Sequence, residues 1–291
     1  MKSLLKKNIY IRKGGDYNFP VILSFPHSGR NYKKDFCESF NIDLIDLRKS
    51  EDAFVDCLFK DIIQKKHNYI FADFPRTFID LNRRRNEINL ADLTSFPETF
   101  ETIETQLALC GFGVIHTKSN SGKDIYKGKI SWNDYNKRIS SFYDPWYASL
   151  YDIIEESKEK FSEIILVDCH SMPSKGIDEN DMNQCDFVIG DLNGKTCSSE
   201  IKSFLKSYFK NSEYKITFNT PFSGQNILRE FANVPEGING IQLEINKKLY
   251  MNENTIMMNN DTKKLEHFLS KFINDLGNYL LGLNNFINAA E

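Results

Sequence analysis

Short apolar segments alternate along this sequence with longer segments whose apolar residues recur at helical spacing. The short segments have the length of buried strands, and several end at a proline or at a charged residue. We therefore predict strands at 21–25, 69–74, 112–116, 163–168, 186–189, 214–218 and 241–245.

The segments between these strands predict helices. One is expected from Ser50 to about Lys66, and another after Ser131, which forms a capping-box pair with Asp134, with an interruption at Pro145. Two more are expected at 198–209 and 262–281. Strands that alternate with helices are typical of a layered α/β fold with a parallel or mixed sheet. Because no internal repeat or long linker is visible, we expect one domain over residues 1–291.

Composition excludes several classes of protein. The chain has 37 Lys and Arg against 40 Asp and Glu, so it lacks the basic bias of a nucleic-acid binder or of an anionic-membrane binder. No apolar run reaches the roughly 18 residues of a membrane helix, and residues 1–12 lack the apolar core of a signal peptide. We therefore expect a cytoplasmic protein. Its six cysteines form no C-x-x-C pair, which argues against a cysteine zinc site.

Polar side chains follow several of the predicted strands. His27 follows the first strand, Asp168 and His170 end the strand at 163–168, and Glu244 lies near the end of the last strand. Ligands of open α/β sheets bind beyond the carboxyl ends of the strands. Two imidazoles and a carboxylate can hold zinc while a second carboxylate acts as a base, so this set is typical of a metal hydrolase. Structural histidines held by hydrogen bonds are the alternative, and strand ends alone do not decide between the two.

The remaining histidines are expected to have other roles. His67 and His267 have polar neighbours and are expected at the surface, and the charge of Lys118 would repel a metal from His116. Cys169 is adjacent to His170, but successive residues of a strand point to opposite faces. We therefore expect Cys169 in the core rather than as a nucleophile.

The segment from Arg76 to Arg85 is the densest polar stretch. It has three interpretations: a solvated basic face, a nucleic-acid surface, which the net charge disfavours, or a carboxylate-binding segment. Arginine binds carboxylates through two parallel hydrogen bonds, and Asp80 would hold the segment rigid by accepting such bonds. Another segment, Gly190–Thr196, has three residues between its glycines where a phosphate-binding loop has four, so a capped turn is expected there.

Five short segments share their residues and their order with one known family. The combination of P-H-S-G, D-L-N-R, D-C-H-S and Q-L-E-I resembles the N-formylglutamate amidohydrolase family, over about residues 20–255. The D-L-N-R segment also resembles aspartoacylases, which are zinc deacylases related to carboxypeptidases. The matching segments are Phe25–Gly29, Ser50–Leu58, Pro75–Arg83, Asp168–Met172 and Gly240–Ile245.

The resemblance implies a zinc-dependent amidohydrolase with a three-layer α/β/α fold. Carried over residue by residue, it makes His27, Asp52 and His170 the ligands of one Zn²⁺ ion. Only the family pattern selects Asp52, which lies at the start of a predicted helix. Glu244 would take the proton of the attacking water and deliver it to the leaving amine. Asp168 would orient a ligand, and a direct bond to His170 would need a bent strand end.

The resemblance also implies how the substrate is held. Arg76 would stabilise the oxyanion together with zinc, and Asn82 and Arg83 would bind a substrate carboxylate. The implied substrate, N-formyl-L-glutamate of histidine breakdown, has two carboxylates, so a second cation is expected. Arg138 and Arg229 are the candidates for it.

Two departures from the family pattern bear on specificity. Trp146 and Tyr147 stand where the family often has Tyr-His, and Gln225 stands where a glycine is common. Such changes can reshape a pocket, so the alternatives are a zinc deacylase or carboxypeptidase for other N-acyl amino acids or peptides, and a non-catalytic binding protein on the same fold. The joint presence of His27 and Glu244 with the other expected site residues argues against the non-catalytic alternative.

Overall fold

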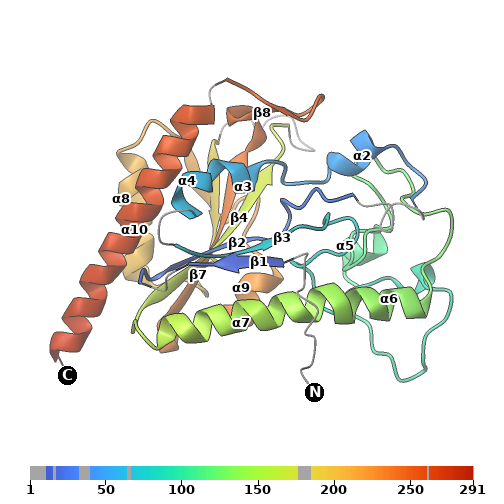
Figure 1. Cartoon of the computed structure of the whole chain (residues 1–291), viewed down its shortest axis with the longest axis horizontal. Helices are drawn as coiled ribbons and strands as arrows, with labels where there is room; N and C mark the ends of the chain where they lie inside the picture. The colour runs from blue at the N-terminus through green and yellow to red at the C-terminus, as the bar shows by residue number, and fades with distance from the viewer. Residues whose placement is uncertain are drawn as a thin grey trace, which may run out of the picture.

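The computed structural model describes residues 11–15, 18–32, 40–63, 67–175, 185–260 and 262–290. Its centre is a seven-stranded sheet (Figure 1). In spatial order, the strands are β1 (Ile11–Gly14), β3 (Asn68–Ala72), β2 (Val21–Phe25), β4 (Ile164–Met172), β7 (Ile238–Asn246), β5 (Phe187–Gly190) and β6 (Ile216–Phe218). A separate small hairpin consists of β8 (Met251–Asn252) and β9 (Met257–Met258).

The sheet is mixed and largely parallel, as predicted. Strands β3, β2, β4 and β7 are parallel neighbours. Strand β1 runs antiparallel to β3, and β5 runs antiparallel to β7 and parallel to β6. The carboxyl ends of β2, β4 and β7 therefore meet at one edge of the sheet, the place where ligands bind in such folds.

Helices cover both faces of the sheet. Helices α8 and α10 lie on one side of it and α7 on the other (Figure 1). The α-helices are α2 (Leu44–Arg48), α3 (Val55–Leu58), α4 (Lys60–Ile63), α5 (Gln106–Leu109), α6 (Trp132–Arg138), α7 (Asp144–Lys158), α8 (Ser199–Lys210), α9 (Asn226–Phe231) and α10 (Thr262–Ala290). Shorter helical turns lie at Leu90–Asp92, Ile139–Tyr143, Val234–Glu236 and Lys247–Leu249.

Alternation along the strands divides the buried side chains between two cores. Leu23 and Phe25 of β2 pack in the core that contains Phe272 of α10. Ile22, the residue before Leu23, points to the opposite face and packs in the other core with Trp146 of α7. Because successive strand residues point to opposite faces, both faces of β2 must be covered, and the three-layer α/β/α arrangement satisfies this requirement.

The predicted strand at 112–116 is wrong, because this segment forms a tight turn. Phe112 and His116 face each other across the turn. It follows Gly111, whose φ of +86° lies in the left-handed region that glycine adopts without strain. The Val114 N–H donates to the Glu87 carbonyl, and the Val114 carbonyl accepts from the N–H of Asp80. The turn therefore supports the segment that carries Asp80.

The predicted helix from Ser50 begins later than expected. Helix α3 starts at Val55, and the residues before it make tertiary contacts instead of helical hydrogen bonds. The N–H of Asp52 donates to the His27 carbonyl at 3.1 Å, and Phe54 has a left-handed φ of 65°. This turn places Asp52 beside His27.

Pro145 does not interrupt the helical segment that follows Ser131. Helix α6, the π-helical turn Ile139–Tyr143 and α7 follow one another directly. Pro145 lies in the first turn of α7, where a missing N–H is tolerated. The capping of α6 is as predicted, because the Ser131 hydroxyl accepts from the N–H of Asp134 at 3.1 Å.

None of the helices in the described part of the chain combines the length and the apolar character that a membrane span requires.

We predict that Phe272→Ala lowers the free energy of unfolding by about 3–5 kcal/mol, because Phe272 is fully buried between α10 and the sheet. Urea denaturation followed by circular dichroism measures the change. Asn278→Ala, on the exposed side of the same helix, should stay within about 0.5 kcal/mol of the parent protein. Equal stability of the two variants would contradict the packing described for α10.

Candidate active site

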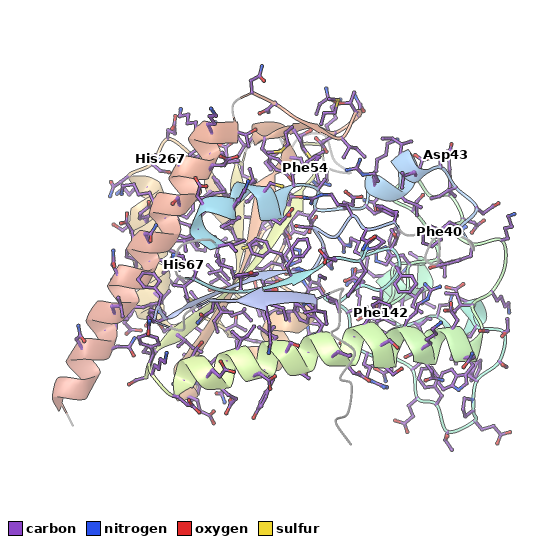
Figure 2. All side chains as sticks on the ribbon, viewed as in Figure 1. Phe40, Asp43, Phe54, His67, Phe142 and His267 are labelled. Carbon is purple, nitrogen blue, oxygen red and sulfur yellow. The ribbon has the colours of Figure 1, made fainter. Side chains whose placement is uncertain are left out.

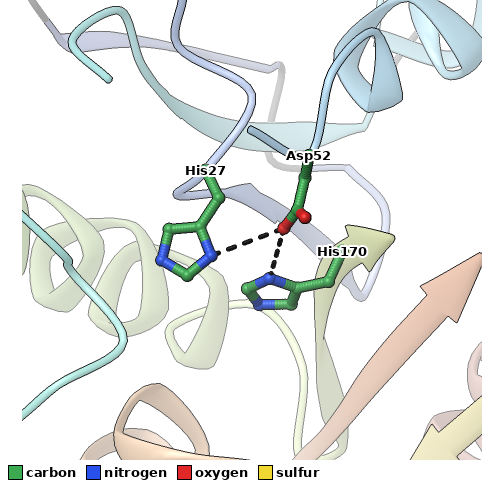
Figure 3. Close-up of side chains that lie close together, drawn as sticks. All are labelled: His27, Asp52 and His170. Carbon is green, nitrogen blue, oxygen red and sulfur yellow. Dashed lines mark hydrogen bonds and ion pairs between the residues drawn. The ribbon is translucent and has the colours of Figure 1, made fainter. Parts of the chain in front are cut away.

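Three buried side chains from distant parts of the sequence meet at the carboxyl edge of the sheet (Figure 3). His27 follows β2, His170 belongs to the adjacent strand β4, and Asp52 comes from the turn before α3. The Asp52 Oδ2 atom lies 3.4 Å from His27 Nδ1 and 2.9 Å from His170 Nδ1. Two imidazole nitrogens and one carboxylate oxygen, all within 4.8 Å of one another, are a donor set that suits zinc.

Each histidine contacts a further carboxylate through its other ring nitrogen. His27 Nε2 lies 2.7 Å from Asp80 Oδ1, and His170 Nε2 lies 2.7 Å from Asp168 Oδ2. In a metal-bound state, a proton on each Nε2 would satisfy these carboxylates and leave the Nδ1 lone pairs for the ion. Outer carboxylates of this kind orient metal-binding histidines.

An unpartnered nitrogen supports the same interpretation. His27 Nδ1 is buried and has no hydrogen-bond partner among the described residues. A buried polar atom without a partner costs free energy, and a metal ion would supply the missing partner. The residues present therefore fit a metal ion.

The bond between Asp168 and His170 does not need a bent strand. Strand β4 continues through both residues to Met172, and residues two positions apart lie on the same face of a strand. The Asp168 carboxylate also accepts from the Ser24 hydroxyl at 2.8 Å. Asp168 is thus held between β2 and β4.

The charges of this cluster shift the pKa values of its members. Burial disfavours the charged form of Asp52, but the contact with His170 and the nearby ring of His27 outweigh it and lower the pKa of Asp52. Burial also disfavours the imidazolium of His170, but the neighbouring Asp168 and Asp52 raise its pKa well above the ordinary value. For Asp80, burial is outweighed by His27 and Arg76, which lower its pKa well below the ordinary value.

Glu244 lies opposite His170 in the register of β4 and β7. Its Oε1 accepts from the side-chain amide of Gln242 at 2.7 Å. Burial raises the pKa of Glu244 to about 7, with the charges of His170 and Asp52 acting in opposite directions. A carboxylate with a pKa near neutrality is suited to both accept and return a proton.

One cavity of about 170 Å³ is lined by His27, Asp52, His170 and Glu244, among other residues. Its wall is polar and includes three cationic side chains, Arg76, Arg83 and Lys247. Arg76 donates to Asp80 Oδ2 at 2.9 Å, and Arg83 donates to Gln225 Oε1 at 3.3 Å. The cavity wall therefore places three cationic side chains near the carboxylates of Asp52 and Glu244.

Asn82 lines the same cavity and connects several strands. Its amide nitrogen donates to Asp168 at 3.3 Å and to Gln242 at 3.2 Å, and its carbonyl oxygen accepts from the N–H of Ile227 at 2.9 Å. The backbone N–H of Asn82 donates to Asp80 at 2.9 Å. These contacts bring the loop after β3 to β4, β7 and α9.

The two arginines predicted as a second substrate cation, Arg138 and Arg229, are not among the described residues that line the cavity. The Arg138 guanidinium is buried and donates to the Phe78 carbonyl, the Tyr126 hydroxyl and the Asp134 carboxylate. Arg229 is exposed on α9. The cavity contains Lys247 instead, whose Nζ donates to the Glu51 carbonyl at 2.7 Å.

Lys247 directly follows β7, the strand that carries Glu244. The sequence signal that would have found it is its position just beyond a strand end, the same rule that selected His27. Lys248 shares that position in the sequence, and it forms an ion pair with Asp186 at 3.2 Å.

The other histidines lie outside the three-residue cluster. The expectation that His67, labelled in Figure 2, is exposed is wrong: it is buried and packs edge-on against Phe19, with ring centroids 4.7 Å apart. His267 is exposed on α10, as expected. His116 Nε2 lies 3.0 Å from Asp80 Oδ2, and burial lowers the pKa of His116 to about 4. The contact of His116 therefore helps to hold the Asp80 carboxylate in place.

The two departures from the family pattern lie in different places. Tyr147 is not among the described cavity residues; its hydroxyl donates to the Leu81 carbonyl at 2.7 Å and accepts from Asn226 at 2.8 Å. Gln225 does line the cavity and contacts Arg83. Of the two, Gln225 is therefore the one that shapes the cavity surface.

Fold and site together define a class: an α/β/α protein with a buried His–Asp–His group and a glutamate at the carboxyl edge of a parallel sheet. The family model for N-formylglutamate amidohydrolase matches residues 19–251, so the chain belongs to this family and is a hydrolase. This confirms the family resemblance of the sequence segments.

Solved structures agree with this assignment. An N-formylglutamate amidohydrolase from Ralstonia eutropha JMP134 is 25% identical and has a TM-score of 0.84, covering 93% of this chain and 98% of that chain. Gene product Atu2144 from Agrobacterium tumefaciens is 14% identical, with a TM-score of 0.65 and coverage of 92% and 94%; it supports the fold alone. A search of curated proteins finds no match.

We predict that the purified protein binds one zinc ion and that His170→Ala weakens this binding, because it removes a nitrogen donor. The loss of zinc affinity should exceed the roughly 10- to 100-fold loss that is typical when a group hydrogen-bonded to a metal ligand is changed. Competition with a zinc-binding dye measures the affinity. His267→Ala removes an exposed histidine and serves as the matched control. Unchanged affinity in His170→Ala would refute its assignment as a ligand.

Proposed function

We propose that this protein hydrolyses the formyl amide of N-formyl-L-glutamate, giving formate and L-glutamate, and that it uses one zinc ion held by His27, Asp52 and His170. Membership of the family supports the reaction. The observation that carries the proposal is the joint placement of the His–Asp–His group and Glu244 in one cavity that also contains cationic side chains.

The chemistry is divided between the metal and the residues around it. When bound, zinc lowers the pKa of a coordinated water to about 7 and polarises a carbonyl oxygen. Glu244 accepts a proton from the attacking water and passes it to the leaving nitrogen. The water oxygen bonds to the formyl carbon, the C–N bond breaks, and the amine leaves as L-glutamate. The raised pKa of Glu244, about 7, suits both proton transfers.

Arg76 is the proposed partner of the oxyanion that develops on the formyl group. Its guanidinium lines the cavity and is held by Asp80, an i,i+4 ion pair at 2.9 Å. A donor fixed before the reaction stabilises developing charge without having to reorganise. Asp80 therefore orients both His27 and Arg76.

Arg83 is the proposed partner of a substrate carboxylate, with Asn82 beside it in the cavity wall. The Arg83 guanidinium is mostly buried and is held by Gln225, and Glu87 lies 3.9 Å away. A partly desolvated guanidinium binds carboxylates more strongly than an exposed one does.

We predict that the zinc-loaded protein releases formate from N-formyl-L-glutamate, that chelation abolishes this activity and that added zinc restores it. A coupled formate dehydrogenase assay on the dialysed sample measures the release. Folded, zinc-loaded protein that releases no formate would reject this substrate. Activity that survives complete chelation would reject the metal.

Glu244→Gln should lower kcat by about 10²-fold or more, because the glutamine cannot accept the water proton. Its zinc content, measured by atomic emission, should be unchanged, since Glu244 is not among the three grouped ligands. Glu236→Gln makes the same chemical change at an exposed position and is the control. If turnover by Glu244→Gln equals that of the control, Glu244 has no part in the proton transfers.

A further inference from the structure

The three cations of the cavity differ in how the protein neutralises them. Arg76 forms an ion pair with Asp80 at 2.9 Å, and Arg83 lies 3.9 Å from Glu87. No carboxylate of the described ranges lies within ion-pair distance of Lys247 Nζ. Its hydrogen bond to the neutral Glu51 carbonyl, 2.7 Å long, uses one of the three N–H donors of an ammonium group.

Lys247 is nevertheless buried, with 7% of its surface exposed. Placing an ammonium group away from water is unfavourable unless a counter-charge or several hydrogen bonds compensate it. Burial accordingly lowers the pKa of Lys247, although Asp52, Glu253 and Glu244 act in the opposite direction. A buried cation in a ligand cavity, with unused donors and without a paired carboxylate among the described residues, is suited to receive an anion from the ligand.

We propose that Lys247 binds one of the two carboxylates of the substrate, while Arg83 binds the other. This inference depends on the proposed function. It assigns the second substrate cation to Lys247, which lines the cavity, in place of the two arginines predicted from the sequence, Arg138 and Arg229. Arg83 is held by Gln225 and Lys247 by Glu51, so the two cations are fixed at different parts of the cavity wall. Two fixed cations would select a dicarboxylate over an N-acyl amino acid with an apolar side chain.

A structural role for Lys247 is the competing explanation. Its hydrogen bond to the Glu51 carbonyl supports the turn that carries Asp52. If this were its whole role, replacing Lys247 would weaken zinc binding and would slow every substrate by the same factor. A carboxylate-binding role predicts instead that the loss depends on which carboxylates the substrate has.

The test compares three substrates in the zinc-loaded full-length protein: N-formyl-L-glutamate, N-formyl-L-norvaline, which lacks the side-chain carboxylate, and N-formyl-4-aminobutyrate, which lacks the α-carboxylate. Lys247→Met should lower kcat/KM for N-formyl-L-glutamate by about 10- to 100-fold, the range for a hydrogen bond to a charged group. For one of the two truncated substrates it should change kcat/KM less than about threefold, within the spread of non-additive effects. Arg83→Met should show the same pattern with the other truncated substrate.

Two further variants separate charge from fold. Lys247→Arg keeps a cation and should retain most of the discrimination between the dicarboxylate and the truncated substrates. Lys248→Met removes the neighbouring lysine, which is paired with Asp186, and should leave all three rates unchanged. Equal losses on all three substrates in Lys247→Met, with reduced zinc content, would overturn the proposal and leave Lys247 as a support for the Asp52 turn.

Binding of glutarate tests the inference without catalysis. Calorimetry on the zinc-loaded protein should detect the binding of glutarate. The Lys247→Met variant should bind glutarate about 10- to 100-fold more weakly. If the parent protein binds glutarate in this way but does not hydrolyse N-formyl-L-glutamate, the proposed reaction fails and the dicarboxylate site stands. Glutarate affinity that is unchanged in Lys247→Met, or absent in the parent protein, would overturn the role of Lys247.

Discussion

Carboxylates buried at the carboxyl edge of the sheet fix the two histidines of this site, and the rest of the site depends on that constraint. Asp80 and Asp168 each contact the Nε2 atom of one histidine at 2.7 Å, and Asp52 lies between the two Nδ1 atoms. Removing one member would leave buried charge uncompensated, which typically costs about 3–5 kcal/mol. The contacts that hold His27 and His170 in place therefore cannot be broken one at a time without a loss of stability.

Asp80 shows how the fold and the chemistry are coupled. Its carboxylate contacts the rings of His27 and His116 and accepts from the Arg76 guanidinium and the N–H of Asn82. The loop after β3 is thus arranged around one acidic side chain that reaches no solvent. The single buried carboxylate of Asp80 thus orients both the candidate metal ligand His27 and the candidate oxyanion donor Arg76. The distance between these two side chains is therefore set by their shared partner.

The parallel sheet supplies the remaining geometry. Register between β4 and β7 places Glu244 opposite His170, and Lys247, three residues after Glu244 in the chain, lines the same cavity. The proposed acid–base residue and the proposed substrate cation therefore lie three residues apart on one short piece of backbone. With these proposed roles, the arrangement would keep a reacting amide and a substrate carboxylate at a set distance, which would favour a ligand of defined length.

The local pattern of the sequence determined the α/β class, most of the strands, the histidine beyond the end of β2 and the histidine near the end of β4. Such features are predictable because strand length and side-chain alternation are properties of neighbouring residues. The family pattern added Asp52, which lies in no strand. Only the tertiary structure decided that the turn at Phe54, with its left-handed φ, brings Asp52 to His27.

Tertiary structure also decided which cations face the cavity. Arg138 is engaged by the Tyr126 hydroxyl and the Asp134 carboxylate, whereas Lys247 lines the cavity with its ammonium bonded only to the Glu51 carbonyl among the described residues. Local sequence does not settle the two cases: Asp134 lies one helical turn before Arg138, but Lys247 and Lys248 share a position just beyond a strand end, and of these two only Lys248 pairs with a described carboxylate, that of Asp186. Whether a charged side chain meets a protein partner or a ligand depends on which distant segments the packed layers bring against it, and the sequence around that side chain does not carry this information.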